Sequence, residues 1–138
     1  MPSALIIEAD LAARRVLQII LGRQGWQVTA VDAVDFERAL IGPVAELVYI
    51  NESIGDDCGY RLLFALRADR RWRRARIVMA GVGDSGRSAL CARELGADGF
   101  LSLPISTAQA RAKLLPHASE ETRRPRARGV FFASAPAS

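Results

Sequence analysis

The stretch ELGADGFLSLP, residues 94–104, contains the end of one predicted helix and the whole of the next predicted strand. Gly96 follows a segment with helical spacing, and glycine is the usual residue just past the end of a helix. Residues 99–103 form a short apolar run that stops at Pro104, as expected of a buried strand. A helix joined so closely to a strand is typical of an alternating α/β structure.

The same alternation fills the chain before this stretch. Apolar runs predict strands at residues 4–8, 26–31, 46–50, 76–80 and 99–103. Helical spacing and capping residues predict helices at 11–21, 35–41, 59–68, 85–95 and from Ser106 to Pro116. Five strand–helix units with short connections predict a single α/β domain, a doubly wound five-stranded parallel sheet with helices on both faces.

The pattern fails near His117. Residues 117–138 are dominated by Ser, Glu, Arg, Pro, Gly and Ala, and only the run VFF at 130–132 is apolar. We therefore predict one domain over residues 1–116 and an arginine-rich tail over residues 117–138.

Positive charge is concentrated in two segments. Residues 67–76 hold six arginines and one aspartate, a local charge of +5, and residues 120–138 carry +2. The whole chain carries +4, so the remainder is net acidic at −3. Two basic patches on an otherwise acidic protein indicate an anionic partner.

Several classes of protein are disfavoured by composition. No apolar run approaches the roughly 18 residues that a membrane-spanning helix needs, so membrane insertion is not expected. The amino terminus lacks the basic and apolar regions of a secretory signal, which favours a cytoplasmic location. Cys58 and Cys91 lack metal-site spacing and are expected to be reduced thiols.

Three pieces of the sequence, in order, resemble the receiver domain of bacterial response regulators. They are LIIEAD at 5–10 followed by Arg14, the Gly59 that opens the third helix, and ELGADGF at 94–100 followed by Pro104. The resemblance covers residues 4 to about 115. It implies the doubly wound sheet with strand order 2-1-3-4-5.

The resemblance also implies a phosphorylation pocket at the carboxyl ends of the strands, and here the sequence departs from the family. The acidic pair that holds Mg²⁺ becomes Glu8 and Ala9, with Asp10 just beyond. The phosphoacceptor position falls on Asn51, whose neutral amide is a poor nucleophile. The hydroxyl position falls on Gly81 and the lysine position on Leu103.

These departures predict a degenerate receiver, a pseudo-receiver, that cannot take a phosphoryl group. Loss of two charged oxygen ligands disfavours Mg²⁺ as a cofactor. The alternative is a shifted alignment in which Asp56 or Asp57 is the acceptor. Otherwise Glu8, Asp10, Asp56 and Asp57 are interpreted as solvated loop acids. With a single histidine, His117, no catalytic dyad or histidine metal site can form, so we do not expect an enzyme.

The tail segment RRPRARG, residues 123–129, is a candidate ligand site. Guanidinium groups grip phosphate oxygens or the edge of guanine with two parallel hydrogen bonds. A guanine dinucleotide with two phosphates needs several such groups. The candidate ligands are Arg123, Arg124, Arg126 and Arg128.

Topology adds a second basic patch to this candidate site. In the predicted sheet the last helix ends at the amino-terminal pole, where the loop between the third helix and the fourth strand also lies. That loop carries Arg70, Arg71, Trp72, Arg73 and Arg74. Trp72 is a candidate stacking surface, or alternatively packs against the neighbouring helix end.

A receiver-like domain with an arginine-rich extension resembles the Cle proteins, chemotaxis-regulator-like effectors. That resemblance implies binding of cyclic di-GMP as a regulatory ligand, followed by a protein partner such as the flagellar motor switch. Two alternatives remain open. One is a ligand-free interaction module docking on a kinase, adaptor or motor protein through the last two helices and the fifth strand. The other, ranked third, is nonspecific nucleic-acid binding.

Overall fold

The computed structural model describes residues 2–32, 36–54, 57–82 and 86–115. The strands are β1 Ser3–Ile7, β2 Gln27–Val31, β3 Leu47–Asn51, β4 Ser53–Ile54, β5 Asp57–Cys58, β6 Arg76–Val82 and β7 Gly99–Leu103. The helices are α1 Leu11–Arg23, α2 Phe36–Leu40, α3 Gly59–Ala68, α4 Gly86–Glu94 and α5 Thr107–Leu114.

Five strands form one parallel sheet in the order β2-β1-β3-β6-β7. This confirms the predicted fold class and strand order. The predicted loop after β3 instead contains a two-stranded antiparallel hairpin of β4 and β5. Strands this short carry no hydrophobic periodicity, so the sequence pattern could not reveal them.

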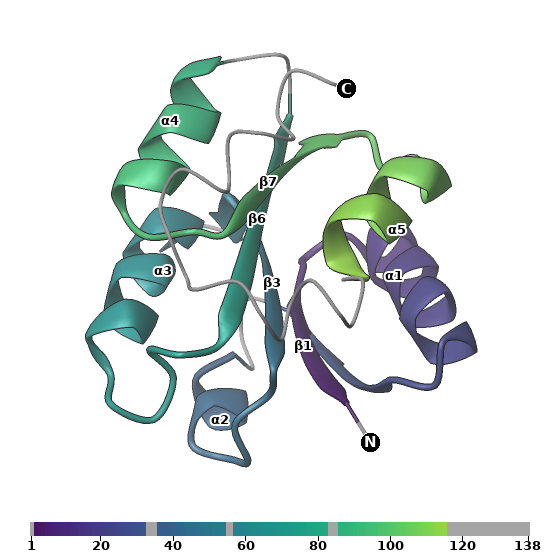
Figure 1. Ribbon diagram of the computed structural model, residues 1–138, viewed down its shortest axis with the longest axis horizontal. Helices are drawn as coiled ribbons and strands as arrows, with labels where there is room; N and C mark the ends of the chain where they lie inside the picture. Colours follow the sequence, from purple (N-terminus) through teal and green to yellow (C-terminus); the bar gives the residue numbers. More distant parts are fainter. Residues whose placement is uncertain (1, 33–35, 55–56, 83–85, 116–138) are drawn as a thin grey trace.

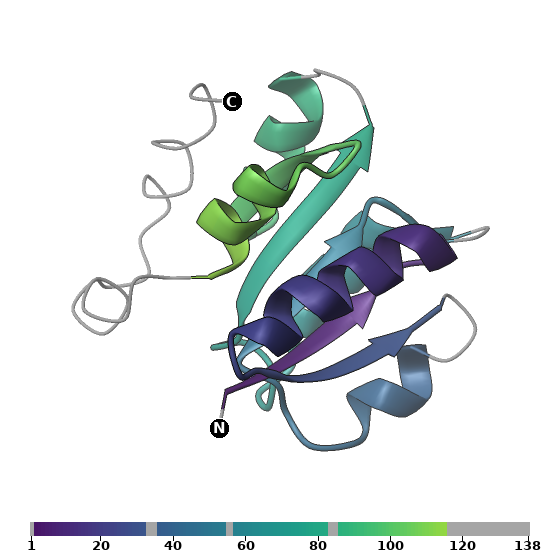
Figure 2. The same ribbon diagram turned by 90° about the vertical axis from the view of Figure 1, so that its right-hand side faces the viewer.

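Helices cover both faces of the sheet (Figures 1 and 2). α1 and α5 lie side by side on one face, and α2, α3 and α4 cover the other (Figure 1). Each face has its own apolar core, built from opposite sides of the same strands because successive strand residues alternate in direction. Ile6 and Tyr49 face α1 and α5, whereas Ile7 and Ile50 face α3.

Ser106 and Gly96 lie at helix ends as predicted, and Asp10 is a cap that was not predicted from the sequence. Asp10 caps α1 by accepting a hydrogen bond from the Ala13 amide at 2.8 Å, and Ser106 caps α5 by accepting one from the Gln109 amide at 3.1 Å. Gly96 has a φ of +102°, a left-handed conformation that a side chain disfavours, directly after α4.

Candidate functional site

The carboxyl ends of β1, β3 and β6 bring together positions that the sequence predicts for a degenerate phosphorylation site. Asn51 ends β3 and lies opposite Ala80 of β6, so Gly81 is one residue beyond it. Glu8 follows β1, and its amide donates to the Val31 carbonyl at 3.0 Å. Three of the positions predicted from the sequence therefore meet at one edge of the sheet.

Glu8 is a buried carboxylate rather than a solvated loop acid. Its exposed fraction is 1%, and it is the one buried charged residue among those that the structure describes. It accepts hydrogen bonds from the Tyr49 hydroxyl at 2.9 Å and from the Asp10 amide at 3.2 Å. The prediction for Glu8 was wrong because the strand pattern does not reveal a polar group satisfied from a neighbouring strand.

Asn51 donates its side-chain amide to both oxygens of Glu8, at 2.9 and 3.0 Å. Its own carbonyl oxygen accepts from the Ser53 amide at 2.9 Å, which forms an Asx-type turn into β4. Both halves of the amide are thus engaged. A carboxylate in the same place would face Glu8 with like charge and no donor, so Asn51 and Glu8 suit each other chemically.

Burial beside a carboxylate also controls Tyr49. Loss of solvent raises the pKa of the Tyr49 hydroxyl far above its usual 10, and the adjacent Glu8 charge raises it further. The hydroxyl therefore stays protonated and remains a donor to Glu8. Sequence reasoning placed Tyr49 in a strand and missed this role.

A second carboxylate, Glu52, fills the space beside Gly81. A Cβ atom built on Gly81 would lie 2.2 Å from the Glu52 Oε2 atom, so the glycine is what admits this carboxylate. The Tyr60 hydroxyl donates to Glu52 Oε1 at 2.6 Å and lies 3.3 Å from the Ser88 carbonyl of α4. Burial, followed by this hydrogen bond, raises the pKa of Tyr60. No periodic pattern in the sequence points to Glu52 or Tyr60.

The remaining predicted pocket positions contribute little chemistry. Leu103 ends β7 and pairs with Val82, and it packs beside the α1–α5 core. Asp10 is exposed and serves as the cap of α1. Asp56 and the side chain of Asp57 lie outside the described residues. Within the described part of the chain, no three His, Cys, Asp or Glu side chains are grouped to hold a metal ion.

At the opposite pole, Trp72 is a core residue. Its exposed fraction is 1%, and its indole nitrogen donates to the Leu40 carbonyl at 3.0 Å. The ring therefore presents no face to a nucleotide base, which corrects the prediction of a stacking surface and favours the alternative of packing. An indole with its nitrogen satisfied is a typical core group.

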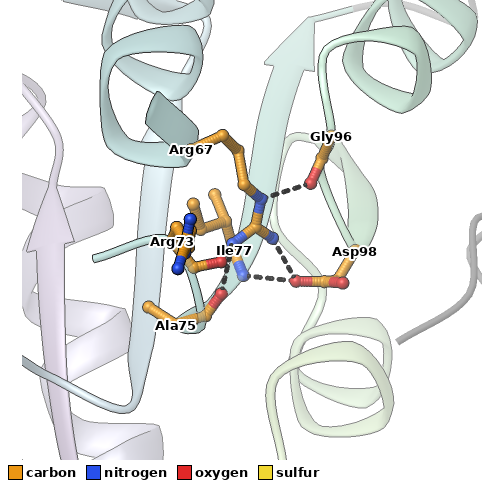
Figure 3. A network of polar contacts seen from close by, with 6 residues as sticks. All are labelled: Arg67, Arg73, Ala75, Ile77, Gly96 and Asp98. Atoms are coloured by element: carbon orange, nitrogen blue, oxygen red, sulfur yellow. Dashed lines mark hydrogen bonds and ion pairs between the residues drawn. The ribbon is translucent and has the colours of Figure 1, made fainter. Parts of the chain in front are cut away.

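Three arginines of the basic segment are occupied by structural contacts. Arg67 donates to the carbonyls of Gly96, Arg73 and Ala75 and forms an ion pair with Asp98 at 2.6 Å (Figure 3). Asp98 in turn accepts from the Ile77 amide at 2.8 Å. One guanidinium thus joins α3, the loop before β6 and the loop before β7.

Arg71 and Arg76 are likewise engaged. Arg71 donates to the Leu40 and Gly42 carbonyls, and Arg76 donates to the carbonyls of Lys113 and Leu114. Arg70, Arg73 and Arg74 are exposed in the loop. Arg71 is exposed as well, but its guanidinium binds the turn after α2.

The contact of Arg76 with α5 bears on the two basic patches. It places the end of α5 against the first residue of β6, next to the loop that carries Arg73 and Arg74. This agrees with the predicted pole. The four tail arginines, Arg123, Arg124, Arg126 and Arg128, lie outside the described residues, as does the boundary between the predicted domain and tail.

We compared the chain with family models, curated proteins and solved structures. No family model matches the chain. The transcriptional regulatory protein GltR of Pseudomonas aeruginosa is 29% identical over 113 residues, which are 81% of this chain and 47% of GltR. The chain thus spans about half the length of this curated relative.

Solved structures agree with that likeness. The chemotaxis response regulator CheY4 of Vibrio cholerae matches with a TM-score of 0.74 at 17% identity, over 83% of this chain and 96% of that one. A Burkholderia pseudomallei response regulator, solved with a phosphorylated aspartic acid, matches at 0.73 and 24% identity, over 88% and 71%. The chain is a domain with the response-regulator receiver fold. Among its described helices, none is long and apolar enough to cross a membrane.

Proposed function

We propose that this receiver-fold domain signals by noncovalent association with a protein partner, without accepting a phosphoryl group. One observation carries the proposal: the Asn51 amide sits at the end of β3 and is bound to both oxygens of the buried Glu8. An amide offers no nucleophilic oxygen for an acyl phosphate. The Asn51 amide and the Glu8 carboxylate bind each other, and this contact connects the ends of β1 and β3. We expect no catalysis there.

Incubation of the full chain with acetyl phosphate and Mg²⁺, followed by intact-mass measurement, tests this proposal. We expect no phosphorylated species, with a receiver of intact acidic site as the positive control. Mapping an adduct to Asp56 or Asp57 would overturn the proposal and favour the shifted alignment.

The face formed by α4, α5 and β7 remains our candidate surface for the protein partner. Leu90 of α4 is 51% exposed and Val82, at the end of β6, is 75% exposed. Exposed aliphatic side chains at a surface of this kind favour protein contact. A binding assay with the flagellar switch protein or a histidine kinase, using Leu90→Glu, would test the site. Binding that survives removal of residues 116–138 would favour a ligand-free interaction module.

The second candidate function is binding of cyclic di-GMP by the tail arginines before the protein partner is engaged. It is favoured by the contact between Arg76 and Leu114, which brings the end of α5 to the first residue of β6, next to the loop with the exposed Arg73 and Arg74. Calorimetry with the dinucleotide should show binding by the full chain and none by a chain cut at Pro116. Absence of heat with the full chain would remove this candidate and leave the first proposal intact.

A further inference from the structure

The turn after α2 and the arginine loop form one continuous surface at the amino-terminal pole. We call residues 41–44 the apolar turn and residues 69–75 the arginine loop. Arg71 of the loop donates to the Leu40 and Gly42 carbonyls, on either side of Ile41. Trp72 donates to the same Leu40 carbonyl. These bonds fix the turn against the loop.

The apolar turn projects its aliphatic side chains into solvent. Ile41 is 79% exposed, the most exposed large apolar side chain among the described residues, and Val44 is 40% exposed. The turn directly after α2, which begins with Ile41, lies at the same end of the molecule as the loop after α3 (Figure 1). A protruding aliphatic side chain is suited to a deformable partner, such as the interface of a lipid bilayer.

Positive charge lies on one side of this apolar turn, in the arginine loop. The neighbouring loop exposes Arg70, Arg73 and Arg74, and the segment from Arg67 to Arg76 carries a local charge of +5 on a chain whose remainder is net acidic. Peripheral binding to anionic lipid has two components, exposed cations and an exposed aliphatic group, and this pole offers both. The cations attract the headgroups, and the aliphatic group enters the interface between headgroups and acyl chains.

We infer that the amino-terminal pole is a peripheral binding surface for anionic lipid membranes, with Ile41 entering the interface and Arg70 and Arg73 contacting headgroup phosphates. This goes beyond the proposed function and does not depend on it. The opposite pole, with Glu8, Asp10 and Glu52, would then face away from the negatively charged surface. A folded polyanion such as DNA would use the same arginines but would gain nothing from Ile41.

Vesicle co-sedimentation with the full chain tests the inference. Vesicles of phosphatidylcholine with phosphatidylserine should retain the protein, and vesicles of phosphatidylcholine alone should not. Ile41→Ser should weaken partitioning by about tenfold, since it removes the aliphatic group that the lipid interface would bury. Arg70→Ser with Arg73→Ser should weaken it by roughly fivefold for each arginine.

Matched controls lie on α1, which covers the opposite face of the sheet from α2 (Figure 1). Ile19→Ser and Arg15→Ser remove an exposed aliphatic group and an exposed charge, and neither should change partitioning. Equal losses in the control and test variants would overturn the inference. The inference would also be overturned if both test variants kept full vesicle binding while replacement of the four tail arginines abolished it. The tail alone would then bind the vesicles.

A further arm separates lipid from other polyanions. If Ile41→Ser binds vesicles as well as the unaltered protein while the arginine variant loses both vesicles and a DNA duplex, the pole is a general polyanion site and the inference is wrong. Dinucleotide calorimetry on the same variants keeps this result apart from cyclic di-GMP binding. Unchanged dinucleotide binding by Ile41→Ser with reduced vesicle binding would support the inference.

Discussion

The side-chain amide of Asn51 donates to both carboxylate oxygens of Glu8, at 2.9 and 3.0 Å. Glu8 is buried, and its other donors are a tyrosine hydroxyl and a backbone amide. A buried carboxylate surrounded by neutral donors is stable only while each donor remains, because an unpaired charge in the interior is costly. The hydrogen-bonded contact between the ends of β1 and β3 therefore depends on an amide at position 51.

Replacing Asn51 by Asp should destabilise the protein by about 2–4 kcal/mol at pH 7, because it removes a donor and places two carboxylates in contact. Urea denaturation in the presence of a chelator measures this. The like charge raises the pKa of one carboxyl in the folded variant above its unfolded value, so the folded state takes up a proton as the pH falls. The difference in free energy of unfolding between the parent protein and the variant should therefore decrease from pH 7 towards pH 4. A variant as stable as the parent at pH 7 would contradict the account.

Both tyrosines of the chain should resist ionisation in the folded protein. Burial raises the pKa of Tyr49 and Tyr60 above the usual 10. A tyrosine whose pKa is raised on folding contributes stability that is complete below pH 10 and is lost as the pH rises further. Phenolate absorbance during an alkaline titration should appear only as the protein unfolds. A reversible step near pH 10 with the fold retained would be inconsistent with these environments.

Gly81→Ser, which introduces the family's hydroxyl, should displace the Glu52 carboxylate. The new Cβ would overlap Glu52 Oε2, and the side chain would have to leave its hydrogen bond with Tyr60. We expect a loss of about 1–2 kcal/mol. In the Glu52→Ala background the same substitution should cost little, and a double-mutant cycle by urea denaturation measures the coupling. Additive effects would show that the two residues do not compete for space.

Arg67→Ala should be among the more damaging substitutions on the surface of the domain, at about 3 kcal/mol. It leaves Asp98 without its ion pair and removes the donor to three carbonyls. Arg67→Lys should recover only part of the loss, since one ammonium cannot match the guanidinium fork. Arg70→Ala, in the exposed loop nearby, is the matched control and should change stability by less than about 0.5 kcal/mol. Thermal unfolding that ranks Arg70 above Arg67 would refute this assignment.

The fold could be predicted from the sequence because strands buried on both faces are continuous apolar runs and helix ends carry capping residues. Ser106 and Gly96 are examples of such ends. The site could be predicted only as a set of positions. That Asn51 and Glu8 occupy neighbouring strand ends followed from the topology, but Glu8 was interpreted as solvated, because its burial depends on a tyrosine from another strand.

Other parts of the site had no sequence signal. The position of Glu52 over Gly81 depends on the hairpin of β4 and β5, which is too short to show periodicity. Trp72 in an arginine-rich loop is compatible with stacking or with packing, and only the contact with Leu40 distinguishes the two. Whether the tail arginines bind a ligand stays a prediction.

The Tyr60 hydroxyl has one proton but two acceptors within reach, Glu52 Oε1 at 2.6 Å and the Ser88 carbonyl at 3.3 Å. The shorter contact, to a charged oxygen, takes the proton. If Glu52 moves outward, the same proton becomes fully available to the Ser88 carbonyl, and the hydrogen bond that already joins Tyr60 to the first part of α4 becomes stronger. The movement of one side chain would thus shift the main hydrogen bond of Tyr60 from the β3–α3 connection to α4, and this shift requires no covalent modification.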